Sequence, residues 1–338
     1  AIQRPTAIPS YLNSADYAML YNEAQLNDSY TSGTAYMPRF SDQDIELYRN
    51  GSDPLFHPNM DWTGDFLRKT TLRTQHNFTL TGGTDRVKYF VSAGYYSQEG
   101  MYNHTKVDAD HDVNAHNARF NFRSNMDVKI TDALSASLSL SGQKEQRHSS
   151  PWNPFYIMAS IQQTFPTSHP YANNNPDYYA VTNISARNVK AVTDPSVMGF
   201  DKVQNKRFEG TASLNYAFQN IKGLSMKGLF YYRNEDNFRD LFQKKYHYYA
   251  YDKAADQYNV VYTGFNPSNL KRAVWNLETY MLQASINYEK TFGNLHHVKG
   301  LLLSETTKEN YRELDGFREF AIDAIPELDN GNDKNKTN

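Results

Sequence analysis

One stretch of this chain limits what it can fold into more than any other. From residue 118 to residue 130, small or apolar side chains alternate one for one with charged or polar ones. Successive side chains of a β-strand point to opposite faces, so the alternation predicts a strand with one apolar and one charged face. The first set is Ala118, Phe120, Phe122, Ser124, Met126, Val128 and Ile130, and the second is Arg119, Asn121, Arg123, Asn125, Asp127 and Lys129.

The same period recurs along most of the chain. Strands are predicted near residues 74–83, 86–97, 117–130, 133–148, 203–219, 223–240, 273–291 and 295–310. Each reaches the roughly 9 to 11 residues that a tilted membrane-spanning strand needs. A soluble antiparallel sandwich also shows alternation, but its strands usually have about 5 to 6 residues. Strand length therefore favours a transmembrane antiparallel β-barrel.

The connections between these strands alternate between short and long. Short turns are predicted at 82–85, 131–132, 220–223 and 293–294, and long loops at about 98–116, 149–202, 241–272 and 311–338. Outer-membrane barrels have short periplasmic turns and longer extracellular loops. The alternation predicts that the long loops lie outside the cell.

The composition agrees with this fold class. The chain has 26 Tyr and 19 Phe although its mean hydropathy is −0.75. Lipid-facing barrels combine aromatic girdles with a polar interior. The net charge of −2 gives no basic field for nucleic acid, and no run of about 18 apolar residues predicts a membrane-spanning helix. The opening AIQRPTAIPS shows no secretory signal and is interpreted as an internal start.

Two short helices are predicted near the N-terminus. Residues 14–26 place apolar side chains at helical spacing behind Ser14. Residues 41–49 begin with Ser41 and Asp44 in the arrangement of a capping box and end before Asn50-Gly51.

Residues 61–101 resemble the SusC/RagA-like TonB-dependent transporters of Bacteroidetes. They read DWTGDFLRKTTLRTQHNFTLTGGTDRVKYFVSAGYYSQEGM. Asp61-Trp62, His76-Asn77, Gly82-Gly83-Thr84, residues 89–95 and Gln98-Glu99-Gly100 occur in that family's order. The likeness is close over about the first 150 residues, and beyond them it extends only to the barrel pattern.

The resemblance implies a partial barrel. The family's barrel has about 22 strands around an N-terminal plug. Plug and TonB box would precede Ala1 and are absent from this chain. Residues 1–5 would end the first strand, 6–72 would form an extracellular segment with two short helices, 73–310 would hold eight spanning strands, and 311–338 would be an extracellular loop. About nine strands leave open edges that are costly in lipid, so the remaining plug and barrel segments are expected as partners.

The resemblance also implies a function. We expect an outer-membrane nutrient importer that takes up oligosaccharides or peptides, powered through TonB and capped by a SusD-like surface lipoprotein. The alternatives are a small independent outer-membrane barrel that acts as a binding or adhesion module, and a soluble glycan-binding β-sandwich. No catalytic motif is present, so neither an enzyme nor a cofactor is expected.

Aromatic residues in two long loops are the candidate ligand-binding residues. Flat rings can stack on sugars, and Asn173, Asn174 and Asn175 supply donors and acceptors beside them. The alternative is that the rings only pack the loops or form the outer girdle. The candidates are Trp152, Tyr156, Tyr171, Tyr178, Tyr179, Tyr248 and Tyr249.

A weaker candidate is a calcium site at Asp108, Asp110 and Asp112. The spacing resembles an EF-hand loop, but Val113 stands where that loop requires Gly and Arg119 where it requires Glu. A solvated acidic loop is the favoured interpretation, and no metal is expected.

Overall fold

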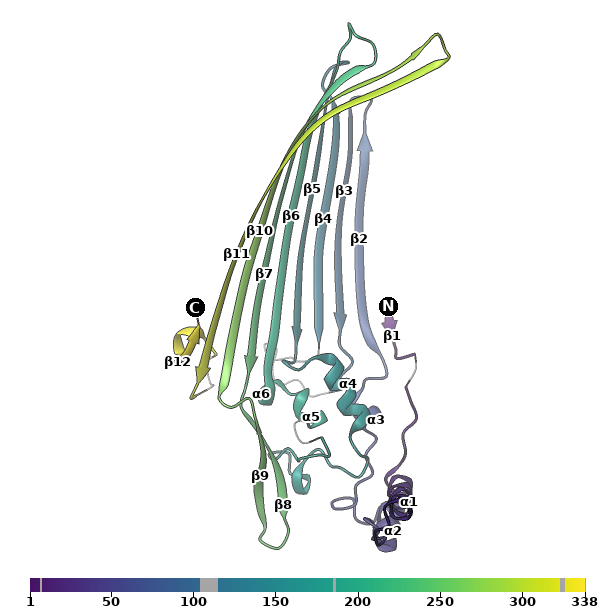
Figure 1. The fold of residues 1–338 in the computed structure, drawn as a ribbon, viewed down its shortest axis with the longest axis vertical. Coiled ribbons are helices and arrows are strands. Elements are labelled where there is room, and N and C mark those ends of the chain that lie inside the picture. Colours follow the sequence, from purple (N-terminus) through teal and green to yellow (C-terminus); the bar gives the residue numbers. More distant parts are fainter. Residues whose placement is uncertain (7, 104–114, 185–186, 323–325, 338) are drawn as a thin grey trace.

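The computed structural model describes residues 1–6, 8–103, 115–184, 187–322 and 326–337. Long antiparallel strands form one curved sheet, and short helices, loops and a small hairpin gather at one end of it, here called the loop region (Figure 1). Short turns join the strands at the opposite end.

Eight long strands confirm the predicted all-β architecture. They are β2 (Thr71–Gly83), β3 (Val87–Glu99), β4 (His116–Lys129), β5 (Leu134–Ser149), β6 (Gly199–Ala217), β7 (Leu224–Gln243), β10 (Ser268–Phe292) and β11 (His296–Phe320). Each corresponds to one predicted strand, and neighbours in the sheet are antiparallel.

The two edges of the sheet carry short strands. β1 (Ile2–Gln3) pairs with β2, as expected for the end of a first strand, and β12 (Asn332–Thr337) pairs with β11. The order is β1-β2-β3-β4-β5-β6-β7-β10-β11-β12. The expectation that residues 311–338 are only a loop was wrong, because β11 continues to Phe320 and β12 follows it.

A left-handed dipeptide makes the tightest turn of the sheet. Gly293 and Asn294 have φ angles of 55° and 56° between β10 and β11. Two consecutive positive φ values are typical of the type I′ turn, whose twist matches that of the paired strands. Gly and Asn adopt this region at the least steric cost, which explains this Gly-Asn pair.

The uninterrupted register keeps each side-chain type on one face. From β4 to β10, the even-numbered side chains share what we call the apolar face, and the odd-numbered ones share the polar face. On the apolar face Phe230 lies opposite Leu282, and Leu214 opposite Ala136. Leu282 is 58% exposed and Leu214 is 55% exposed. Toward the turns this face is apolar but uncovered, whereas toward the loop region it also carries charged side chains such as Lys144 and Arg272.

Ion pairs cross the polar face. Arg239 donates from Nε and from a terminal nitrogen to the two carboxylate oxygens of Asp201, at 2.9 and 3.0 Å. Arg207 approaches Glu235 to 2.6 Å. Such bidentate and charge-assisted contacts fix neighbouring strands in register.

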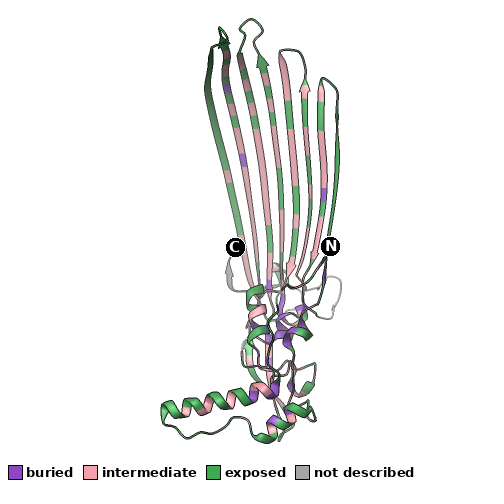
Figure 2. Cartoon of the chain, turned by 90° about the vertical axis from the view of Figure 1, so that its right-hand side faces the viewer, coloured by how far each residue is buried: buried purple, intermediate pink, exposed green. Residues whose placement is uncertain are grey.

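The buried core lies in the loop region and not in the sheet. Figure 2 shows buried residues concentrated below the strands, while the strands are mostly intermediate or exposed. In the part of the chain that is described, no helix is both long and apolar enough to cross a membrane.

The structure contains the two helices that the sequence predicted and several shorter ones. Both N-terminal helices are confirmed as α1 (Ser14–Ser32) and α2 (Asp42–Asn50), and α2 has the capping box of Ser41 and Asp44. Shorter ones were not predicted: α3 (Trp62–Phe66), α4 (Pro154–Gln163), η1 (Ala172–Asn174), α5 (Val189–Val192), α6 (Pro195–Met198) and η2 (Leu328–Asn330).

A hairpin occupies a second predicted loop. β8 (Tyr246–Asp252) and β9 (Gln257–Gly264) form their own two-stranded sheet within residues 241–272. The predicted long loops do connect the long strands here, but the hairpin within 241–272 and the helices α4 to α6 within 149–202 were not predicted.

Candidate binding region

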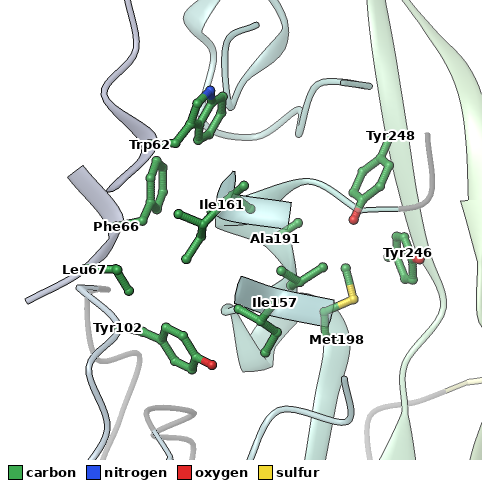
Figure 3. Packing of buried hydrophobic residues seen from close by; sticks show 12 residues of the cluster. Trp62, Phe66, Leu67, Tyr102, Ile157, Ile161, Ala191, Met198, Tyr246 and Tyr248 are labelled. Carbon is green, nitrogen blue, oxygen red and sulfur yellow. The ribbon is translucent and has the colours of Figure 1, made fainter. Parts of the chain in front are cut away.

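The loop region has a hydrophobic core built from segments far apart in the sequence. Figure 3 shows side chains of α3, α4, α5 and β8 converging on it. Its buried members are Trp62, Phe66, Leu67, Tyr102, Ile157, Ile161, Val189, Ala191, Val192, Met198, Tyr246 and Tyr248. Close packing of this kind gives the loops a defined shape on which a binding surface can be held.

Buried polar groups in this core have partners that tie the loops together. Trp62 donates from Nε1 to the carbonyl of Phe165 at 2.9 Å. The Asn188 side chain is fully buried and donates to the carbonyls of Pro170 and Ala180, both at 2.8 Å. Buried amides without such bonds would destabilise the fold, so these contacts fix the path of the 165–188 segment.

Tyr178 lies in a cluster of rings from the two predicted loops. Its ring stacks on Tyr258 of β9, with centroids 3.9 Å apart and planes 7° apart, and meets Tyr249 of β8 edge-on at 5.0 Å. Asn173 and Asn175 donate to the Tyr258 hydroxyl at 3.3 and 3.5 Å. The packing therefore already covers one face of Tyr178.

Backbone hydrogen bonds hold this cluster in place. Tyr249 donates its N–H to the carbonyl of Tyr179 at 2.8 Å, and Val181 donates to the carbonyl of Tyr249 at 3.0 Å. Ala180 and Tyr249 thus form a parallel bridge between the 170–181 segment and β8. The two loops act as one unit.

Tyr171 and Tyr179 form a second pair of rings, with centroids 5.3 Å apart. The Tyr179 hydroxyl donates to a carboxylate oxygen of Asp194 at 2.6 Å. Burial, reinforced by that carboxylate, raises the pKa of Tyr179, and burial raises the pKa of Tyr171. Both phenols remain neutral at physiological pH and serve as hydrogen-bonding groups.

Tyr248 is a core residue in this structure. Its side chain is fully buried, and its hydroxyl oxygen accepts the N–H of Asn188 at 3.0 Å. Burial raises the pKa of Tyr248. Its ring has no face free for a ligand, which matches the alternative of loop packing and not the sugar-stacking role.

Trp152 and Tyr156 lie at the start of α4. Trp152 is partly buried and packs against Phe265, at 5.8 Å between centroids. Tyr156 is 49% exposed beside Phe155, which is 71% exposed. The guanidinium of Arg187 lies 5.3 Å from the centre of the Tyr156 ring. Among the predicted rings, Tyr156 presents the most open surface.

A cleft beside α4 was missed by the sequence reasoning. It has a volume of about 320 Å³ and lies between segment 10–12 and segment 161–166, with Trp62 in its wall. Tyr17 and Phe165 also line it, and their rings lie 4.8 Å apart. Burial raises the pKa of Tyr17 to about 12. No local pattern marks this cleft, because its walls come from distant segments.

The candidate calcium ligands Asp108, Asp110 and Asp112 lie outside the described residues. Within the described ranges, no group of three or more His, Asp or Glu side chains is arranged to hold a metal ion.

His57 links α2 to the segment that follows it. Its Nδ1 lies 2.8 Å from a carboxylate oxygen of Asp53, and its Nε2 lies 3.1 Å from one of Asp44. Hydrogen bonds from Ser41 lower the pKa of Asp44, and the contact with His57 lowers the pKa of Asp53. The two carboxylates and the His57 ring hold α2 in place at what we call the outer end of the loop region, which is formed by α1 and α2.

Comparison with known proteins identifies the fold. No protein-family model matches the chain. Among curated proteins it is similar to TonB-dependent receptor P26 of Formosa agariphila, with 29% identity over 83 residues, which are 25% of this chain and 7% of that protein.

Solved structures match over nearly the whole chain. The RagAB peptide importer matches in its closed-closed state with a TM-score of 0.68 at 14% identity, over 99% of this chain and 36% of that one. Its open-open state matches with a TM-score of 0.67 at 14% identity, over 100% of this chain and 36% of that one. The RagAB peptide transporter matches with a TM-score of 0.59 at 16% identity, over 81% of this chain and 28% of that one.

The chain thus spans about a third of the solved chains that it matches and a smaller part of the curated relative. The likeness to these solved structures, at 14–16% identity, is one of fold. In fold, the chain is a partial SusC/RagA-like β-barrel.

Proposed function

We propose that this chain forms part of the wall and of the extracellular loops of an outer-membrane, TonB-dependent nutrient importer. One observation carries the proposal: the long strands expose a continuous apolar face that neither helix nor sheet covers among the described residues. Large exposed apolar surfaces mark interaction sites with membranes or partners. Relatives that are receptors and importers support the same function and give no support for an enzyme.

The dimensions of the apolar face fit a bilayer. Tyr280 and Tyr288 both lie on this face of β10, eight residues apart, as do Phe208 and Tyr216 on β6. Eight residues span about 26 Å along a strand, which at the tilt of about 35–45° of outer-membrane barrels covers roughly 20 Å of their ~25 Å apolar band. Aromatic rings at the two margins of that band are the girdles expected at lipid–water interfaces.

The loop region is proposed to face the cell exterior and to contact the cargo. Its rigid core carries open rings such as Tyr156 and a cleft lined by Tyr17. Such surfaces suit an oligosaccharide or a peptide. The matched structures are of a peptide importer, so we keep a peptide beside an oligosaccharide as the proposed cargo. A SusD-like lipoprotein as the lid, and TonB as the source of energy, complete the proposal.

The test is extraction and heat-modifiability of the complete polypeptide that contains this chain. Purified outer membranes are extracted with detergent and run on a denaturing gel with and without boiling. We expect solubility only in detergent, a mobility shift on boiling, and co-purification of plug, remaining barrel strands and a lipoprotein. A protein that stays soluble without detergent supports the β-sandwich alternative. A chain that folds alone in detergent supports the small independent barrel.

A further inference from the structure

The apolar face changes character at one row of residues on β5 and β6. Gly142 lies opposite Phe208, and the ring of Phe122 lies close over Gly142. The next pair toward the loop region on the same face is Lys144 and Lys206, directly opposite each other. Two ammonium groups therefore follow immediately after two aromatic rings.

In the part of the chain that the structure describes, no ion pair includes either lysine of this pair. Directly opposite side chains have Cβ atoms about 4.5–5.5 Å apart, and like charges there are destabilising. Among the described residues, neither Lys144 nor Lys206 has a carboxylate within ion-pair distance. Asp236 lies opposite Lys206 on β7, but its carboxylate accepts amide hydrogens from Asn276 at 2.7 Å and Asn234 at 3.1 Å.

A hollow on the same face adjoins the pair. It has a volume of about 290 Å³, and its walls include Lys202, His148, His116 and Asp240. Asp240 lies opposite Lys202 on β7, and its carboxylate accepts from Arg272 at 2.7 and 2.8 Å. Lys202 lies opposite His148 in the register, and His116 lies opposite His148 on the other side. The Nζ of Lys202 is 4.4 Å from the centre of the Phe200 ring, so the ammonium remains at the edge of the hollow.

The depth of these lysines follows from the proposed membrane position, on which this inference depends. Two residues of strand separate Lys206 from Phe208, a rise of about 7 Å. On β4, Phe120 lies opposite Lys144, so the ammonium groups stand at the aromatic margin, where the lysine stems can extend to the level of lipid headgroups. At the turn margin, Lys290 lies beyond Tyr288, with its Nζ 5.0 Å from the ring centre of Phe292.

We propose that Lys144 and Lys206, with Lys202 beside the hollow, bind the phosphate group of a membrane lipid in the leaflet nearest the loop region. A phosphate between the two ammonium groups would replace their repulsion with two charge-assisted hydrogen bonds. The acyl chains of the same lipid would lie along the apolar face below. A basic cluster next to an apolar band is the arrangement that anionic lipid headgroups favour.

The test uses the complete detergent-purified transporter and native mass spectrometry. The variants are Lys144→Gln/Lys206→Gln and, as a matched control, Lys88→Gln/Lys227→Gln, which removes two lysines from the polar face. The probes are monophosphoryl lipid A, the same lipid after enzymatic removal of its phosphate, and inorganic phosphate alone.

We expect wild type and control to bind the phosphorylated lipid alike, and the double variant to bind it about 30-fold more weakly, which is about 2 kcal/mol at 1.4 kcal/mol per tenfold. The proposal would be overturned if wild type, control and double variant bound the phosphorylated lipid equally. It would also be overturned if wild type bound the dephosphorylated lipid as tightly as the phosphorylated one. Displacement by inorganic phosphate at equal concentration would assign the site to a free anion instead. Heat-modifiability of each protein, measured in parallel, reports separately whether the barrel itself exists.

Discussion

The ring of Tyr178 stacks on the ring of Tyr258 at 3.9 Å, joining the 170–181 segment to the β8–β9 hairpin. This contact explains why two loops that are separate in sequence form one surface. The order of the hairpin depends on it, together with the backbone bonds between Tyr249 and its neighbours.

Replacing Tyr258 with Leu is expected to loosen the hairpin. Leu retains apolar area but removes the stacked ring and the hydroxyl that accepts from Asn173. Aromatic pairs contribute about 0.5–1.5 kcal/mol beyond the area they bury, so hydrogen exchange in β8 and β9 should quicken roughly tenfold. Exchange mass spectrometry measures this, with Tyr30→Leu on the exposed part of α1 as the control. Unchanged exchange in the hairpin would show that the stack has no stabilising role.

Replacing Tyr156 with Ala is expected to weaken cargo binding without altering the fold. This ring is 49% exposed and contacts the rings of Phe155 and Trp152 edge-on and the guanidinium of Arg187. Central aromatic contacts of an interface typically cost more than about 1 kcal/mol on truncation, or roughly five- to tenfold in Kd. Titration calorimetry with oligosaccharide and peptide panels measures the effect, and Tyr30→Ala is the control, its side chain being 78% exposed. Equal affinities for both variants would remove Tyr156 from the binding surface.

Two glycines on the apolar face are expected to respond differently to alanine. A Cβ at Gly142 would lie 2.2 Å from a ring carbon of Phe122, whereas a Cβ at Gly228 meets nothing within 4 Å. Overpacking typically costs about 1–3 kcal/mol, so Gly142→Ala should lower the melting temperature and Gly228→Ala should not. Thermal unfolding in detergent, followed by tryptophan fluorescence, compares them. A larger loss for Gly228→Ala would contradict the packing described for Phe122.

Acid is expected to loosen the outer end of the loop region first. Hydrogen bonds from Ser41 lower the pKa of Asp44, and the contact with His57 lowers the pKa of Asp53. A lowered carboxyl pKa contributes stability that is present above the unfolded value near 3.9 and is lost as pH falls through the folded value. Hydrogen exchange in α2, measured from pH 6 down to pH 3 and corrected for the intrinsic rate, should therefore rise below about pH 4.

The control for this pH effect is Ser41→Ala. The bond from the Ser41 backbone N–H, which is the largest cause of the lowered Asp44 pKa, remains in this variant, but the second cause, the bond from the Ser41 hydroxyl, is removed together with the cap on the Asp44 N–H. Opening of α2 should therefore begin at a higher pH than in the wild type. If both proteins open at the same pH, the capping box does not govern the acid response.

The local pattern of side chains along the chain was sufficient to predict the strands of the sheet. The alternation from Ala118 to Ile130 defines β4 within one residue at its C-terminal end, because a strand's two-residue period follows from its own backbone. The Ser41 capping box likewise predicted where α2 begins, whereas the N-cap of α1 is Asn13 and not the predicted Ser14. The Gly293-Asn294 pair marked the turn between β10 and β11 because its φ angles favour those residue types.

Local pattern failed where contacts between distant segments decide the outcome. Nothing near Tyr248 in sequence shows that Asn188 bonds to its hydroxyl and that the ring is buried, and Tyr258 was not singled out although it covers a face of Tyr178. The hairpin at residues 246–264 was not distinguished within the predicted long loop, because a short hairpin gives few periods to count.

The sequence by itself thus determined the long antiparallel strands, their two unlike faces and the alternation of turns and loops, since each depends on residues close together in the chain. Only the tertiary structure decided which loop rings are packed and which are open, and that Lys144 and Lys206 face each other. Strand register and loop packing depend on long-range pairing, in which every segment's position is fixed by partners far away in sequence.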